Sequence, residues 1–215
     1  MYTAFFDLDH TILSTSSGNI MFKGSYDHGI IGRMQIVRSI GTILLYRLGI
    51  MNAETAVKRW MRCYRGINVD TIRPLVSEWA DTLKGFVRGD ARREIQRHRE
   101  RGARTVILSA SPTFICERMR EYLQMDDILC TELETVDGML SGNLSRSYCH
   151  GPEKLVRAVR YCAERGQSMK DAWYYADSLA DLPVLEAVGN PVCVTPDPRL
   201  LRIARNRGWN VSQWL

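Results

Sequence analysis

Residues 2–11 read Tyr-Thr-Ala-Phe-Phe-Asp-Leu-Asp-His-Thr, and this stretch decides how the rest of the chain is interpreted. It begins with a short apolar and aromatic run that is typical of a buried β-strand. The run ends at two acids, Asp7 and Asp9. Side chains two residues apart in an extended chain point to the same side, so we expect both carboxylates to share one site. Because two clustered carboxylates repel each other, they favour a bound cation or a shared proton.

A hard cation such as Mg²⁺ is bound in proteins by one or two carboxylates together with water and phosphate oxygens. The pattern Asp7-x-Asp9-x-Thr11 is therefore compatible with a metal site. The alternative interpretation is a pair of solvated acids in a turn between a strand and a loop. Polar groups elsewhere in the chain help to decide between the two.

Two of these groups are Ser109 and Lys154. Ser109 ends the predicted strand 102–109, and a predicted helix begins soon after it, so a hydroxyl and free backbone N–H groups are available to an anion. Lys154 lies in the first turn of a predicted helix, where a cation is disfavoured unless an anion is nearby. The structural alternatives are that Ser111 caps the helix that follows it and that Lys154 is an ordinary surface lysine.

A second acidic pair, Asp177 and Asp181, follows in the last third of the chain. Asp177 ends the predicted strand 172–177. Asp181 comes four residues later, within reach of the same site through the turn. The alternative for Asp181 is a place in the first turn of the next helix, which an acid also favours.

Apolar runs of strand length alternate with segments of helical periodicity over most of the chain. The predicted strands cover residues 2–8, 102–109, 172–177 and 192–195, with a weaker candidate at 128–131. The predicted helices cover residues 90–101, 112–123, 152–165, 179–188 and 199–207, and an Asp-Gly pair at 137–138 predicts a hairpin. This alternation predicts an α/β fold with a Rossmann-like parallel sheet between helices. Ligands of such sheets bind beyond the carboxyl ends of the strands, where Asp7, Ser109 and Asp177 are expected.

Residues 14–84 interrupt the alternation, because they show helical patterns only. We therefore predict a small helical cap over residues 15–84, inserted after the first strand and placed over the site. Residues 1–14 and 85–215 would form the core. Helical spacing puts five side chains of the cap on roughly one side, namely Ile36, Ile40, Ile43, Leu44 and Arg47. This stripe either packs the cap helices together or lines the entrance to the site.

The composition excludes several classes of protein. Of the 215 residues, 45% are hydrophobic and 25% are charged, as in ordinary globular proteins and unlike disordered or collagen-like chains. No apolar run reaches the roughly 18 residues of a membrane span, and the N-terminus lacks the basic start of a signal peptide. The six cysteines form no CxxC pair. They are expected to be free thiols in a reducing compartment, which predicts a cytoplasmic location.

The net charge of +5 comes mainly from arginine. Seven arginines lie within residues 88–104 and four within residues 199–207. We interpret them as solvated helix faces and do not expect a nucleic-acid partner. The alternative is a surface that attracts anions.

Taken in chain order, the acid pair, the hydroxyl, the lysine and the second acid pair resemble the four motifs of the haloacid dehalogenase-like (HAD) hydrolases. Residues 5–13 (Phe-Phe-Asp-Leu-Asp-His-Thr-Ile-Leu) look like the first motif, and residues 174–185 look like the last. Together with residues 189–192 and 196–200, they resemble subfamily IB, which has a small helical cap and includes phosphoserine phosphatases. The resemblance spans nearly the whole chain.

The resemblance implies nucleophilic catalysis by a carboxylate. Asp7 would attack phosphorus and form an aspartyl-phosphate, while Asp9 would act first as general acid and then as general base. Mg²⁺ would be held by the Asp7 carboxylate, the Asp9 backbone carbonyl and Asp177, and Asp181 would orient that shell through water. The phosphoryl oxygens would be bound by Thr11, Ser109, the backbone of Ala110, and Lys154.

These roles predict a Mg²⁺-dependent phosphomonoester hydrolase acting on a small phosphorylated metabolite. One alternative is a phosphatase of lipid or other amphiphilic phosphates. Another is a phosphate-binding or interaction module without activity, against which Asp9 argues because a binder has no use for it. Phosphoserine fits poorly, because residues 14–19 contain no acid where phosphoserine enzymes typically carry a glutamate. We expect neither a nucleic-acid partner nor a transmembrane segment.

Overall fold

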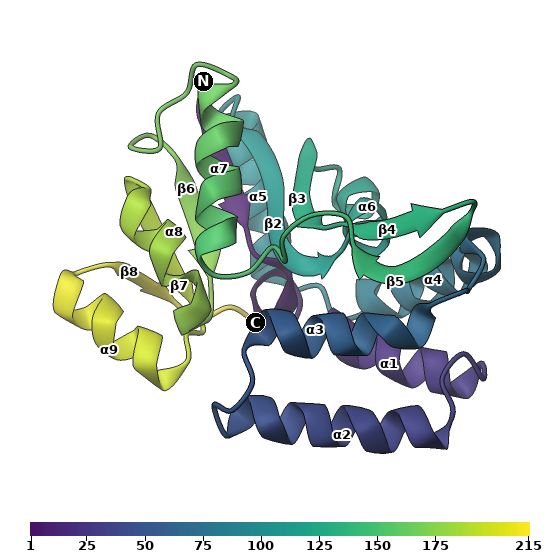
Figure 1. The fold of residues 1–215 in the computed structure, drawn as a ribbon. Coiled ribbons are helices and arrows are strands. Elements are labelled where there is room, and N and C mark those ends of the chain that lie inside the picture. Colours follow the sequence, from purple (N-terminus) through teal and green to yellow (C-terminus); the bar gives the residue numbers. More distant parts are fainter.

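The computed structural model describes residues 1–215, with the exception of the side chains of Ile43, Tyr46 and Arg47. Its centre is a six-stranded sheet with the strand order β3-β2-β1-β6-β7-β8, and all its pairings are parallel (Figure 1). The strands are β1 (Thr3–Phe6), β2 (Arg104–Pro112), β3 (Asp127–Thr131), β6 (Trp173–Ala176), β7 (Asn190–Val194) and β8 (Asn210–Ser212). Because β1 lies between β2 and β6, the carboxyl ends of these three strands meet at one edge.

Helices cover both faces of this sheet (Figure 1). Neighbouring residues of β1 point to opposite faces, so Phe5 and Phe6 belong to two different apolar clusters. The cluster around Phe5 includes residues of α7 (Pro152–Ala163), α8 (Leu182–Ala187) and α9 (Pro198–Arg207). The cluster around Phe6 includes residues of α5 (Gly89–Glu100) and α6 (Thr113–Leu123). The predicted Rossmann-like α/β sandwich is confirmed.

Four α-helices lie between Leu13 and Val87 in the chain. They are α1 (Ser17–Asp27), α2 (Arg33–Arg47), α3 (Ala53–Met61) and α4 (Val69–Lys84). The chain enters and leaves this segment at one place, where Leu13 and Val87 form an antiparallel bridge. A helical segment that begins and ends at the same place is what a cap inserted after the first strand requires. The predicted boundaries of the cap at residues 15 and 84 stay a prediction.

A two-stranded antiparallel hairpin, β4 (Leu133–Val136) and β5 (Met139–Leu144), follows β3. Asp137 and Gly138 connect its strands with φ values of 49° and 76°. A two-residue hairpin turn of type I′ has positive φ at both central residues, which the Asp-Gly pair provides. The hairpin also contacts the helical segment through a bridge between Asn68 and Met139.

Several element boundaries differ from the sequence predictions. The strand predicted over residues 102–109 continues to Pro112, and its pairing with β3 shifts after Leu108. The three-residue strand β8 was not predicted.

All six cysteines are free thiols, as expected. Among the residues whose side chains are described, no helix has both the length and the apolar content needed to cross a membrane.

Candidate active site

The carboxyl edge of β1, β2 and β6 brings together most of the residues selected from the sequence. Asp7 directly follows β1, and Asp177 directly follows the neighbouring strand β6. Ser109 lies in the last part of β2. Lys154 lies in the first turn of α7, and Asp181 ends a short 3₁₀ turn, Leu179–Asp181. Residues that are far apart in the chain thus meet because parallel strands end at a common edge.

Lys154 is the centre of a buried ionic cluster. Its Nζ donates hydrogen bonds to Asp7 Oδ1 at 2.7 Å, to Asp181 Oδ1 at 2.6 Å and to the Tyr174 hydroxyl at 3.1 Å. The three charged residues Lys154, Asp7 and Asp181 are 3%, 6% and 2% exposed. A charge buried to this degree is tolerated only when it is paired and hydrogen-bonded. The alternative of an ordinary surface lysine is therefore wrong.

Three carboxyl groups, those of Asp7, Asp177 and Asp181, lie near the single ammonium group of Lys154. Burial and, to a smaller extent, the neighbouring Asp181 carboxylate together raise the pKa of Asp177 to about 7. Burial likewise holds the pKa of Asp7 above its usual range, although Lys154 acts in the opposite direction. Burial opposes ionisation of Asp181 as well, but Lys154 and the hydrogen bonds to its carboxylate keep its pKa below the usual value.

The carboxylates of Asp7, Asp177 and Asp181 could together hold a metal ion. One oxygen from each lies within 4.8 Å of the others. Such an all-oxygen set is the kind that Mg²⁺ prefers, and a divalent cation would offset the charge that raises the pKa of Asp177. The residues present therefore fit a hard divalent cation.

The side chain of Asp9 does not join this group of carboxylates. Its Oδ1 accepts a hydrogen bond from the Ser17 N–H at 2.9 Å, and its Oδ2 accepts from the hydroxyls of Ser17 at 3.1 Å and Ser16 at 3.2 Å. That Asp7 and Asp9 share one site stays a prediction, because the structure shows only that the Asp9 carboxylate lies outside the group that could hold a metal. Alternation applies only while a strand continues, and the chain leaves β1 at Asp7 to form a wide helical turn, Leu8–Ile12.

The remaining predicted residues lie around this turn and the end of β2. The Thr11 hydroxyl donates to Asp177 Oδ1 at 3.3 Å, so Thr11 positions an acid in this structure. The buried Ser109 hydroxyl accepts from the Ser111 N–H at 3.1 Å. The Ala110 carbonyl accepts from the Thr131 hydroxyl at 2.7 Å.

Ser111 does not cap α6, contrary to the alternative considered above. The residue that precedes α6 is Pro112, and it makes no side-chain cap. The Ser111 hydroxyl instead lies 2.7 Å from the Ser17 hydroxyl and 3.5 Å from Asp9 Oδ1. The end of β2 and the start of α1 thus meet at Asp9 through two hydroxyl groups. Asp181 also makes no side-chain cap for α8, because its carboxylate is used by Lys154.

Tyr174 is a site residue that sequence reasoning missed. Its hydroxyl donates to Asp181 Oδ1 at 2.6 Å and accepts from Lys154, and its side chain is fully buried. Within the apolar strand β6 a tyrosine looks like a core residue. Its position three residues before Asp177 was the available signal, since a buried tyrosine usually needs a hydrogen-bond partner.

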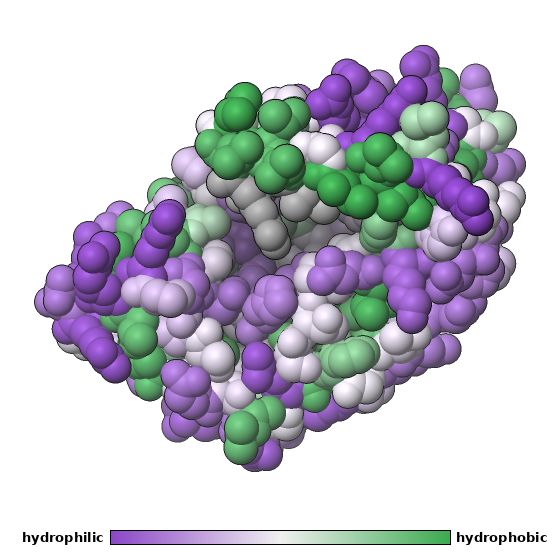
Figure 2. All heavy atoms as spheres, turned by 90° about the horizontal axis from the view of Figure 1, so that it is seen from below, coloured by the Kyte–Doolittle hydropathy of each residue, from purple (hydrophilic) through white to green (hydrophobic). Residues whose placement is uncertain are grey.

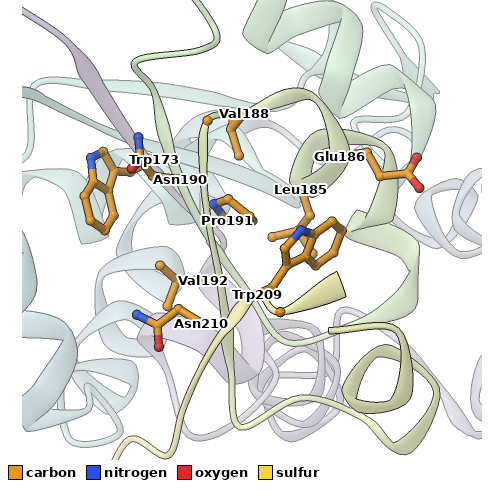
Figure 3. Close-up of a pocket in the computed structure, with 11 residues that line it drawn as sticks. Trp173, Leu185, Glu186, Val188, Asn190, Pro191, Val192, Trp209 and Asn210 are labelled. Carbon is orange, nitrogen blue, oxygen red and sulfur yellow. The ribbon is translucent and has the colours of Figure 1, made fainter. Parts of the chain in front are cut away.

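Two cavities of the structure lie away from these residues. One, of about 380 Å³, is lined by Trp173, Asn190 and Trp209 among others (Figure 3). Trp173 and Asn190 begin β6 and β7, so this cavity lies at the opposite end of the strands from Asp177. The other, of about 570 Å³, lies among α4, α6 and the hairpin. No predicted site residue lines either cavity.

Comparison with known proteins agrees with this arrangement. The sequence pattern of haloacid dehalogenase-like hydrolases matches residues 4–186. The fold is similar to the solved structure of a protein of unknown function from Bordetella pertussis Tohama I, with a TM-score of 0.90 and 25% sequence identity. The match covers 98% of this chain and 97% of that chain.

Curated relatives match over nearly the whole chain. The "Inhibition of morphological differentiation protein" of Streptomyces azureus is 32% identical over 97% of this chain and 76% of its own length. A phosphoserine phosphatase of Mycobacterium tuberculosis is 30% identical over 98% of this chain and 70% of its own length. A histidinol-phosphatase of Neisseria meningitidis is 26% identical over 97% of this chain and 96% of its own length. The names of the last two relatives agree with the predicted class of enzyme, a phosphatase. The chain belongs to the haloacid dehalogenase-like hydrolase family.

Proposed function

We propose that this protein is a Mg²⁺-dependent phosphomonoesterase that forms an aspartyl-phosphate at Asp7. The observation that carries the proposal is the buried cluster of Asp7, Lys154 and Asp181, with Asp177 beside it at the carboxyl edge of adjacent strands. A cluster of this kind is costly to maintain in a folded protein, and phosphoryl transfer uses each of its members.

Asp7 is the nucleophile in this proposal. Its carboxylate oxygen forms a bond to phosphorus while the bond from phosphorus to the ester oxygen breaks. Asp9 gives a proton to the departing alkoxide and later takes a proton from the water that cleaves the aspartyl-phosphate, so the enzyme returns to its first state. The hydroxyls of Ser16 and Ser17, which bond to the Asp9 carboxylate, position it for this work.

Lys154, Ser109, Thr11 and the Ala110 N–H are proposed to bind the phosphoryl oxygens. The transferred group carries its charge on three equatorial oxygens, and fixed donors directed at them stabilise the transition state. Lys154 already donates to two carboxylates and to Tyr174. Of these three contacts, the one to the uncharged Tyr174 hydroxyl is the longest. We therefore expect Lys154 to exchange this contact for a phosphoryl oxygen.

Mg²⁺ would be held by the Asp7 and Asp177 carboxylates and the Asp9 backbone carbonyl, and it would supply positive charge next to the phosphoryl group. Asp181 would orient that shell while it holds Lys154 in place. Residues 15–84 would act as a cap that shields the aspartyl-phosphate from unwanted reactions. The free thiols of the chain agree with the proposed cytoplasmic location.

The proposed substrate is a small phosphorylated metabolite other than phosphoserine. Residues 14–19 offer no carboxylate for an ammonium group, and Ser16 and Ser17 there are engaged with Asp9. The named relatives act on different phosphate esters by name, so they do not select one substrate. A lipid or other amphiphilic phosphate is the second candidate, favoured by the apolar side chains exposed along α2.

A panel of phosphate esters tests the proposal. The purified protein is incubated with phosphoserine, sugar phosphates, an aryl phosphate and a short-chain lysophosphatidate, and released phosphate is measured. We expect turnover with Mg²⁺, loss of turnover with a chelator, and recovery when Mg²⁺ is restored. Turnover that persists in excess chelator contradicts the metal assignment. A tenfold preference for phosphoserine, about 1.4 kcal/mol, contradicts the substrate assignment.

A further inference from the structure

Among the described side chains of helix α2, two small polar ones are buried and several apolar ones are exposed, which is the reverse of the usual pattern. Ser39 and Thr42 are 9% and 6% exposed. Five apolar side chains of α2 and of the residue just after it are 56–64% exposed, namely Met34, Val37, Ile40, Leu44 and Leu48. A helix at the surface of a globular protein normally turns its apolar face toward the core. The stripe predicted from the sequence shares only Ile40 and Leu44 with this set, and for these two the expectation that they pack the cap helices together is wrong. The side chains of Ile43 and Arg47 lie outside the described residues.

The exposed apolar side chains form one continuous stripe. At 100° per residue, the five positions from Met34 to Leu48 fall within about one third of the helix circumference. Ile50, at 71% exposure, lies just beyond the end of the helix. Figure 1 shows α2 at the outer side of the helical segment, beyond α1 and α3, and Figure 2 shows apolar side chains gathered on this outer face. Contiguous apolar surface of this kind marks a site of interaction.

The charged residues of the segment that carries the stripe are of one sign. Between His28 and Ala53 the sequence contains no aspartate or glutamate, whereas it contains Arg33, Arg38 and Arg47. Arg33 and Arg38 are both exposed. This combination of an apolar stripe with arginines and no acid matches the chemistry of helices that lie in the interface of an anionic membrane.

We propose that α2 docks this protein on the surface of a membrane that contains anionic lipids. The apolar stripe would enter the boundary between headgroups and acyl chains, and the arginines would lie among the lipid phosphates. A second copy of the chain fits less well, because pairing of two α2 stripes would bring arginines of both copies together with no acid in the segment to oppose them. The docking is an attachment to one face of the bilayer, since α2 has only 15 residues.

Vesicle sedimentation tests the proposal, and its readout is independent of phosphatase activity. The whole protein is mixed with vesicles of phosphatidylcholine alone or with added phosphatidylserine. We expect binding that needs the anionic lipid and weakens with salt. The variant Val37→Ser/Ile40→Ser/Leu44→Ser should lose at least tenfold in partition coefficient, and Arg38→Glu should lose binding in part.

A matched control comes from α7, where Val156 and Val159 are also exposed, at 58% and 44%. The variant Val156→Ser/Val159→Ser should bind vesicles like the native protein. Because all the substituted side chains are at the surface, thermal unfolding should change little in either variant. Equal vesicle binding by the native protein and the triple α2 variant overturns the proposal. So does a native dimer that dissociates in the triple variant while neither protein binds vesicles, since α2 would then be an interface between copies.

Discussion

Charged side chains are buried at the carboxyl edge of β1 and β6, whereas apolar side chains are exposed along α2. Lys154 and Asp181 are 3% and 2% exposed, but Val37 and Leu44 are 64% and 56% exposed. Both arrangements oppose folding, because a buried charge loses hydration and an exposed apolar group gains none of the benefit of burial. Regions that depart from the usual pattern in this way are where a protein meets its ligands.

The two regions differ in what holds their side chains in place. At the sheet edge the charged side chains are hydrogen-bonded to one another and to Tyr174. The residues of this ionic cluster lie on strands of one sheet, directly after them, or in two helical turns. Along α2 the exposed stripe has no such framework, and α2 itself lies at the outer side of the helical segment (Figure 1). We therefore expect single substitutions at the sheet edge to have large effects on turnover, and substitutions on α2 to affect docking alone.

The largest effect is expected for Asp7→Asn. An amide cannot act as the nucleophile, so hydrolysis of every phosphate ester should stop. The control is Asp137→Asn, which makes the same change in an exposed hairpin turn whose positive φ asparagine tolerates. Asp137→Asn should hydrolyse an aryl phosphate like the native protein. Near-native turnover by Asp7→Asn would place the chemistry elsewhere.

A smaller, uniform loss is expected for Ser109→Ala and Lys154→Met. If both side chains bind the phosphoryl group, kcat/KM should fall by a similar factor for every ester, about 10² to 10³ for one such donor. Because Lys154→Met leaves Asp7 and Asp181 unpaired, its folding must be verified by thermal unfolding. Losses that differ strongly from one ester to another would instead place these side chains in the leaving-group pocket.

A still smaller loss of turnover is expected for Tyr174→Phe. The substitution removes one hydroxyl that donates to Asp181 and accepts from Lys154, a change of about 1.5 kcal/mol or tenfold in rate. A positioning role predicts a lower kcat with nearly unchanged KM. The control is Tyr161→Phe, which removes a hydroxyl that contacts Asp127 and Arg104 away from the site. If both variants lose kcat equally, Tyr174 has only a structural role.

The last prediction concerns stability, because it involves a buried polar group that we place outside the site and from which we expect no effect on turnover. Burial lowers the pKa of His98 to about 4 from an ordinary value of 6.5. As the pH falls below about 6.5, the unfolded chain takes up this proton before the folded chain does. The free energy of unfolding should therefore decrease between about pH 6.5 and pH 4, by no more than about 3 kcal/mol. Urea unfolding of His98→Asn should show a weaker pH dependence in this range, and an unchanged dependence would contradict the assignment.

The sequence was sufficient to predict five of the six strands of the sheet and the edge at which several polar residues meet. Asp7, Ser109 and Asp177 could be placed together because each one follows an apolar strand, and parallel strands end at a common edge. The direction of the Asp9 side chain could not be predicted, since it depends on the wide turn Leu8–Ile12. Periodicity placed Ile40 and Leu44 on one side of α2, but it missed Met34, Val37 and Leu48 and could not show that this side faces solvent, because the packing of the neighbouring helices decides that.

The central claim is that Asp7 becomes phosphorylated, and trapping the intermediate tests it most directly. The Asp9→Asn variant should still cleave an aryl phosphate, because its leaving group needs little protonation. It should hydrolyse the aspartyl-phosphate more slowly than the native protein, by a factor of about 10² to 10⁴. After an acid quench, peptide mapping by mass spectrometry should find one phosphoryl group on Asp7, and Asp7→Asn should carry none. A phosphoryl group on another residue, or one that is still found in the Asp7→Asn variant, would contradict the account.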